Sequence, residues 1–119
     1  MVLSNLEWTF TQEISVPKDI QGLLAEGENP FKAFKTVRDV AVFTNKRLIV
    51  SDAQGITGRK KEIYSLPYKS IIMWSTENAG TIDINSEVEL WTRAGNLKIK
   101  LKRGIDIRAF DQLLSQVVL

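Results

Sequence analysis

The residues best suited to chemistry in this sequence form a basic turn, Gly55-Ile56-Thr57-Gly58-Arg59-Lys60-Lys61. Three cations, Arg59, Lys60 and Lys61, follow a bend with two glycines, and each basic residue near an anionic membrane contributes about 1 kcal/mol of attraction. The glycine spacing matches neither a phosphate-binding P-loop nor a dinucleotide fingerprint. Two interpretations therefore stay open. The turn is either the solvated basic end of a hairpin or a site of salt-sensitive, at most peripheral contact with an anion or a membrane surface.

Enzymatic chemistry has few residue types to work with in this chain. The 119 residues include no histidine and no cysteine. Their absence removes the commonest general base, the thiolate nucleophile and the usual metal ligands. A carboxylate pair drawn from Asp83, Glu87 and Glu89 remains, but these acids lie beside lysines and are interpreted as surface ion pairs. The sequence predicts a protein that is not an enzyme and that binds no cofactor or metal.

The distribution of charge argues against a specific nucleic-acid interface. Residues 1–30 contain one lysine and five acids, a net charge of −4, and residues 31–119 contain fifteen basic residues and nine acids, a net charge of +6. Lysines alternate with apolar residues over residues 96–102, which predicts a strand with one basic face. A turn at Ala94-Gly95 predicts three cross-strand pairs in this hairpin: Glu89 with Lys100, Glu87 with Lys102, and Trp91 with Lys98. The acids would neutralise the basic face, so we predict no specific nucleic-acid partner even though Trp91 offers a base-stacking position.

The sequence contains no apolar run near the roughly 20 residues that span a membrane. Its first residues lack a basic segment, and Glu7 interrupts the apolar residues there, so no signal peptide is indicated. We therefore expect a cytoplasmic protein.

Turn signals divide the chain into a single domain of short strands. Seven strands are predicted, at residues 31–36, 38–44, 47–52, 59–66, 69–77, 87–93 and 96–102. Apolar residues recur every three or four positions over residues 105–119, which predicts a helix with Asp106 at its start. Pro17 begins a short helix that Gly27 ends. Residues 1–14 fit a helix or a strand, and we favour a helix or arm that docks on the domain. This predicts an N-terminal arm and short helix over residues 1–26, followed by a barrel over residues 27–119.

Three of the predicted strands, 38–44, 47–52 and 69–77, are apolar on both faces. A two-residue turn at Asn45-Lys46 pairs Phe43 with Leu48 on one face and Val42 with Ile49 on the other. In strand 69–77, Ile71 and Met73 point one way, and Ile72 and Trp74 point the other way. A barrel wall buries only its inner face, so the outer face must meet residues 1–26 or another subunit. The residues predicted for such a subunit interface are Val42, Ile49, Ile72 and Trp74.

A set of short motifs resembles one protein family over nearly the whole chain. The motifs are Gly27-Glu28, Ala33-Phe34-Lys35, Val37-Arg38-Asp39, Phe43-Thr44-Asn45-Lys46-Arg47-Leu48, Gly55-Ile56-Thr57-Gly58, Pro67-Tyr68-Lys69-Ser70-Ile71 and Trp91-Thr92. Together they resemble the bacterial pleckstrin-homology-like domain family. The resemblance implies a mainly β fold, a seven-stranded antiparallel, partly open barrel capped by a C-terminal α-helix. It also implies a homo-oligomeric ring that serves as an interaction or scaffold module for an unknown protein partner.

The roles expected for the shared residues are structural. Asn45 sets a tight turn, Gly55 and Gly58 permit a bend, and Pro67 ends a strand. Arg47 is expected to bond neighbouring backbone or the carboxylate of Asp39 or Asp52. Two departures from the family matter. The turn at Val37-Arg38 is too short for the anion cup of lipid-binding relatives, and the tight last hairpin could change the number of subunits in the ring.

Overall fold

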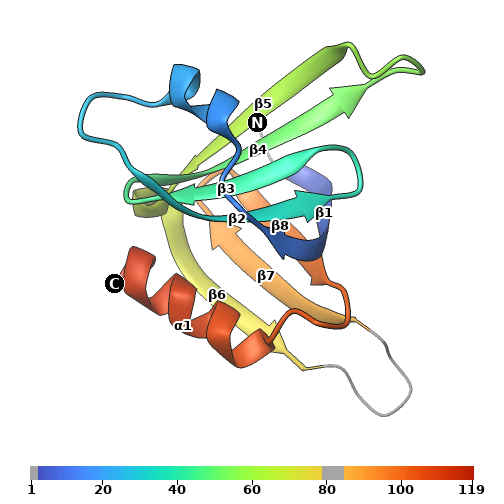
Figure 1. The fold of residues 1–119 in the computed structure, drawn as a ribbon. Helices are drawn as coiled ribbons and strands as arrows, with labels where there is room; N and C mark the ends of the chain where they lie inside the picture. Colours follow the sequence, from blue (N-terminus) through green and yellow to red (C-terminus); the bar gives the residue numbers. More distant parts are fainter. Residues whose placement is uncertain (1–2, 79–84) are drawn as a thin grey trace.

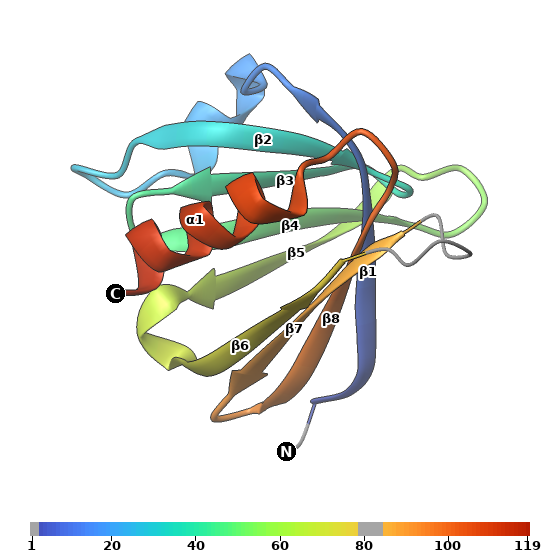
Figure 2. The same ribbon diagram turned by 90° about the horizontal axis from the view of Figure 1, so that it is seen from below.

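The computed structural model describes residues 3–78 and 85–119, with side-chain burial from residue 6 onward. It shows a strongly curled sheet with an α-helix packed across one end (Figures 1 and 2). The strands are β1 (Leu3–Ile14), β2 (Pro30–Thr36), β3 (Val40–Thr44), β4 (Arg47–Gln54), β5 (Lys60–Pro67), β6 (Ile71–Glu77), β7 (Ser86–Thr92) and β8 (Gly95–Leu101). The helices are the 3-10 helices η1 (Lys18–Leu23) and η2 (Tyr68–Ser70) and the α-helix α1 (Ile107–Val118). Each element predicted from residue 31 onward lies within two residues of its expected bounds.

The first strand corrects the prediction of an N-terminal helix or arm. The sheet order is β5-β4-β3-β2-β1-β8-β7-β6, so β1 lies in the middle of the sheet. It pairs antiparallel with β2 and parallel with β8. Trp8 and Phe10 point into the core with 7% and 0% of their surface exposed, while Glu7 and Thr9 point away. This alternation of period two is that of a strand and not of a helix. The sheet therefore has eight strands, not seven, and one of its pairings is parallel.

The two ends of the sheet are β5 and β6, which the short helix η2 connects. Figure 2 shows these two strands diverging from that connection, so the barrel is partly open as predicted. Pro67 is the last residue of β5 and the N-cap of η2. Proline has no backbone N–H for a strand ladder, which agrees with its expected role as the end of the strand.

Inside the barrel, four phenylalanines form the centre of the main core. Phe10, Phe34, Phe43 and Phe110 contact one another with ring centroids 5.3 to 6.0 Å apart. Phe110 comes from α1, which closes the end of the barrel with its apolar face. Asp106 caps α1 as predicted, because its side chain accepts hydrogen bonds from the backbone N–H groups of Arg108 and Ala109.

A second, smaller core lies on the outer face of β2, β3 and β4. It is made of Ile20, Ala33, Val42 and Ile49, each at most 4% exposed, and η1 covers it. The chain therefore covers this outer face itself, which was one of the two possibilities that the sequence left open. The covering helix is a 3-10 helix of six residues that ends at Leu23, so Gly27 does not end it as predicted.

The two predicted hairpin registers had different outcomes. The β3–β4 register is confirmed, with Val42 opposite Ile49 and Phe43 opposite Leu48. The β7–β8 register was wrong by two residues, since Glu89 faces Lys98 and Glu87 faces Lys100. The turn is at Arg93-Ala94, because the Thr92 hydroxyl accepts from the Ala94 N–H and donates to the Gly95 carbonyl. A shift of two residues leaves every side chain on its predicted face.

Candidate interaction surfaces

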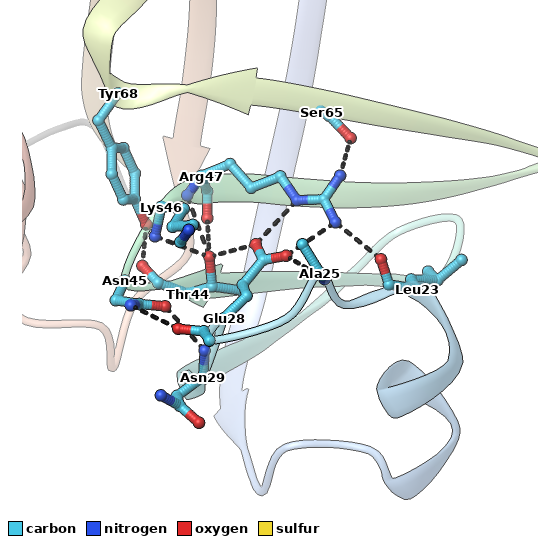
Figure 3. Close-up of polar contacts among 11 residues, drawn as sticks. Leu23, Ala25, Glu28, Asn29, Thr44, Asn45, Lys46, Arg47, Ser65 and Tyr68 are labelled. Atoms are coloured by element: carbon cyan, nitrogen blue, oxygen red, sulfur yellow. Dashed lines mark hydrogen bonds and ion pairs between the residues drawn. The ribbon is translucent and has the colours of Figure 1, made fainter.

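A buried ion pair anchors the segment that covers the second core (Figure 3). Arg47 on β4 bonds both carboxylate oxygens of Glu28, with Nε 2.8 Å from Oε2 and Nη2 3.0 Å from Oε1. The Thr44 hydroxyl donates to Oε2 at 2.7 Å, and the Ala25 backbone N–H donates to Oε1 at 2.9 Å. Glu28 is 5% exposed. The hydrogen bonds from Arg47 outweigh the opposing effect of burial and lower the pKa of Glu28 to about 2.

Arg47 also connects η1 to β4, on which it lies, and to β5. Its guanidinium also donates to the Leu23 carbonyl at 2.8 Å and to the Ser65 hydroxyl at 2.9 Å. Of the partners expected for Arg47, a backbone group is confirmed in the Leu23 carbonyl. The carboxylates named with it, Asp39 and Asp52, were wrong, because Glu28 is the carboxylate within reach. Every oxygen of Glu28 has a donor, and burial leaves no room for a substrate. The cluster is therefore structural, and sequence reasoning missed it although the Gly27-Glu28 motif was visible.

The neighbouring turn shows the structural role expected for Asn45. The Asn45 side chain accepts from the Asn29 N–H at 2.7 Å and donates to the Gly27 carbonyl at 3.2 Å (Figure 3). Tyr68 donates its hydroxyl to the Thr44 carbonyl at 2.7 Å, and burial raises the pKa of this tyrosine. These bonds fasten the β3–β4 turn to the loop before β2.

In the basic turn, the three cations differ in their contacts. Gly55 and Gly58 have φ of 72° and 69°, the positive values that their expected role in the bend requires. Arg59 and Lys60 are exposed, but Lys61 lies 3.0 Å from an Asp39 carboxylate oxygen. Only Arg59 and Lys60 remain as the predicted anion contact.

Two basic residues near the β2–β3 turn also form contacts within the chain. Lys32 lies 3.3 Å from Glu13. Arg38 donates from Nε to the Ala53 carbonyl at 2.7 Å and lies 4.0 Å from Asp52. These contacts use the side chains of Lys32 and Arg38, two of the basic residues that a headgroup site at the first hairpin would need.

A groove of about 430 Å³ lies between η1 and the outer face of the sheet. A single cross-strand row forms its floor and rim: Lys35 on β2, Val40 on β3, Ser51 on β4 and Ile63 on β5. Ile63 is 43% exposed. The row therefore presents an apolar side chain at one end and an ammonium group at the other.

The edge strand β6 carries the largest apolar exposure on a described strand. Ile72 is 68% exposed and Met73 is 52% exposed. The strict alternation predicted here was wrong, because a register shift between Ile71 and Met73 leaves both Ile72 and Met73 outside. Trp74 packs against the core, and its Nε1 donates to Asp111 on α1 at 2.9 Å.

The four residues predicted for a subunit interface do not form one surface. Val42 and Ile49 are buried in the second core of their own chain, Trp74 faces α1, and Ile72 alone is fully on the surface. Of the carboxylates considered for catalysis, Asp83 lies outside the described residues. Glu87 lies 3.6 Å from Lys98, and Glu89 accepts from Asn96.

The described residues show no site for a metal or a membrane span. Within residues 3–78 and 85–119, no three His, Cys, Asp or Glu side chains are grouped closely enough to hold a metal ion. Over the same residues, none of the helices has the length and apolarity needed to cross a membrane.

An eight-stranded, partly open barrel with a C-terminal helix across one end defines a pleckstrin-homology-like domain. The comparison with protein families gives the same result in more detail. The family model "Bacterial PH domain" matches residues 4–118, and the chain belongs to this family.

Relatives and solved structures agree with this assignment. The chain is 49% identical over 83 residues to "Uncharacterized protein YjqA" of Bacillus subtilis (strain 168), a match that covers 70% of this chain and 66% of that protein. It is similar to a DUF1696 family protein with a pleckstrin-homology domain from Shewanella loihica PV-4, with a TM-score of 0.83, 34% identity, and coverage of 91% of this chain and 97% of the other. A pleckstrin homology domain from Shewanella amazonensis SB2B gives a TM-score of 0.70 and 39% identity, over 85% of this chain and 83% of the other. These similarities establish the family and the fold of the chain.

Proposed function

We propose that this domain is a non-enzymatic interaction module that assembles into a symmetric homo-oligomeric ring and recruits a protein partner. The observation that carries the proposal is the edge strand β6, which exposes Ile72 and Met73 side by side. The free edge of a sheet offers unpaired backbone N–H and C=O groups, and clustered exposed apolar side chains usually mark an interaction site.

The chemistry of the remaining surface supports the non-enzymatic part of the proposal. The sequence has no histidine or cysteine. Glu28, whose pKa is strongly shifted, is buried and fully bonded to structural partners. Strongly perturbed groups mark a candidate active site only when a substrate can reach them, and the Glu28 carboxylate is not accessible.

The test is the solution mass measured by light scattering coupled to size exclusion, at several protein and salt concentrations. We expect a single mass that is a multiple of 13.5 kDa and that does not change on dilution. Ile72→Glu should dissociate the assembly, because a charge would be buried in an apolar contact. Ile56→Glu is the matched control, since Ile56 is fully exposed on the basic turn, and it should leave the mass unchanged. A 13.5 kDa species at tens of micromolar would refute the proposal.

A second candidate function is peripheral contact with an anionic membrane, and it rests on the basic turn, residues 55–61. Ile56 stands fully exposed at its tip, next to the exposed cations Arg59 and Lys60. An apolar tip flanked by basic residues suits shallow contact with an anionic membrane. Flotation with vesicles that contain phosphatidylserine tests it. Binding should fall when salt is raised and in Arg59→Glu/Lys60→Glu, and binding that is unchanged in this variant would exclude the site.

A further inference from the structure

We propose that a pocket between β2 and the first turns of α1 binds a small organic amine, an ammonium group carried on an apolar body of about six carbon atoms. The residues that line the pocket come from β1, β2, α1 and the loop before α1. The site is therefore separate from β6 and from the basic turn, and the proposal goes beyond the interaction module and does not depend on self-assembly.

The pocket has the size of a single ring. Its volume is about 170 Å³. An engineered protein cavity of about 150 Å³ lined by leucine, isoleucine and phenylalanine holds benzene. Two small residues at the entrance, Gly104 and Ala109, leave the pocket open to the surface. A Cβ atom built at Gly104 would meet no other atom within 4 Å, and Ala109 is exposed. A ligand can therefore enter from solvent while the barrel stays closed.

The deep end of the pocket is aromatic. Phe34 on β2 and Phe110 on α1 line it with their ring centroids 5.6 Å apart, and Leu113 lies beside them. These three side chains are at most 7% exposed. An apolar ring that enters this end leaves water, which is favourable. A cation within about 6 Å of a phenyl centroid is attracted by the face of the ring. The deep end therefore favours an apolar body with a positive charge close to it.

The charged side chains that line the pocket leave one acceptor free for a ligand. These side chains are Glu13, Lys32 and Asp106, two carboxylates and one ammonium group. Lys32 is already paired with Glu13, since its Nζ lies 3.3 Å from Oε2. Asp106 takes part in none of the ion pairs among the described residues, and its Oδ1 accepts the two backbone hydrogen bonds that cap α1. Its Oδ2 is the acceptor that remains, and a donor with a positive charge gives the strongest hydrogen bond to it.

Other classes of ligand fit less well. An anion would lie beside two carboxylates, and the N–H groups of Arg108 and Ala109 that could bind it at the start of α1 already bond Asp106. A metal ion would leave the apolar end empty, and no three carboxylates are grouped for it within residues 3–78 and 85–119. A neutral ring fills the apolar end but brings no charge to Asp106. An organic amine suits both ends of the pocket.

Three probes that share one ring test this site. The isotope-labelled full chain is titrated with benzylamine, benzyl alcohol and benzoate, and binding is followed by NMR. We expect saturable shifts at the amides of Gly104, Ile105 and Ala109 with benzylamine, and an affinity at least about tenfold higher than for the neutral and the anionic probe. The proposal would be overturned if these amides showed no saturable shift with benzylamine, or if either of the other probes bound equally tightly.

Two substitutions locate the bound amine. Asp106→Asn keeps a good N-cap residue but removes the charge, so it should weaken benzylamine about tenfold and leave benzyl alcohol unchanged. Ala109→Leu fills the entrance with another strong helix former and should abolish the binding of both probes. Gln112→Leu is the matched control, because Gln112 is exposed on α1 and does not line this pocket, and it should bind as the wild type does. Thermal unfolding checks that each variant is folded. A benzylamine affinity that is unchanged in Asp106→Asn or in Ala109→Leu would overturn the proposal.

Discussion

The two halves of the barrel are built from similar strands but are covered in different ways. In the half formed by β2, β3 and β4, Phe34 and Phe43 pack inward while Val42 and Ile49 pack outward under η1. In the half formed by β6, β7 and β8, only the inner face is buried, and polar and charged residues occupy most of the outer face. The apolar side chains that this second half leaves uncovered are Ile72 and Met73. A strand that is apolar on both faces therefore indicates an interface only where the chain supplies no segment to cover it.

The covered half depends on the Glu28–Arg47 pair, and breaking it should have the largest effect. Arg47→Ala leaves the buried Glu28 carboxylate without its cation, which we expect to lower the free energy of unfolding by about 3–5 kcal/mol. Urea unfolding followed by tryptophan fluorescence measures this change. Lys98→Ala is the control in the other half, because its pair with Glu87 is exposed and should contribute less than about 1 kcal/mol. Equal losses in the two variants would contradict the distinction between the halves.

The pH dependence of stability should come from the same pair. The pKa of Glu28 falls from 4.5 to about 2 on folding, so its contribution is complete above pH 4.5 and is lost as the pH falls toward 2. A shift of this size corresponds to about 3 kcal/mol. The difference in unfolding free energy between the wild type and Glu28→Gln should therefore shrink from pH 7 to pH 2.5. A difference that stays constant over this pH range would count against the assignment to Glu28.

The same conservative substitution in each half compares their packing directly. Ile49→Val removes one buried methylene and should cost about 0.5–1.5 kcal/mol. Ile72→Val, at a 68% exposed position, should stay within about 0.5 kcal/mol for the isolated chain. Thermal or urea unfolding at low protein concentration measures both. A larger loss at Ile72 would mean that this side chain is already buried in an assembly under those conditions.

The smallest expected effect concerns the register of the last hairpin. The structure places Lys98 3.6 Å from Glu87, so a double-mutant cycle on this pair should give a coupling of about 0.2–1 kcal/mol. The cycle on Glu87 and Lys102, which face each other in the register predicted from the sequence, should give no coupling. The reverse result would restore the predicted register.

These registers show what the sequence can and cannot predict. The β3–β4 register followed from a two-residue turn at Asn45 and from apolar pairs on both faces, so a single arrangement satisfied all constraints. For β7–β8, two arrangements shifted by two residues satisfy the same alternation, and the Thr92 hydrogen bonds that choose between them involve no periodic signal.

The candidate site was harder to predict than the fold, for a physical reason. Glu28 and Arg47 are 19 residues apart, and their contact depends on how a loop returns over β4. Whether Val42 is a subunit contact or a core residue depends likewise on where η1 lies. The first strand was missed because Leu6 and Phe10 fit a helical spacing as well as Trp8 and Phe10 fit a strand. In each case a tertiary contact decides between local patterns that the sequence alone leaves equivalent.

The parallel pairing of β1 with β8 has a consequence for how the chain folds. Leu6 lies beside Leu97, so β1 needs a partner that is made 91 residues later. Contacts this distant in sequence slow folding, since a long loop must close before they form. During synthesis, the edge of β1 that pairs with β8 stays unpaired until β8 has left the ribosome, and Trp8 and Phe10 on β1 remain incompletely packed until then. A chain that stops before Gly95 should therefore fail to reach the native barrel, although most of its strands would already be present.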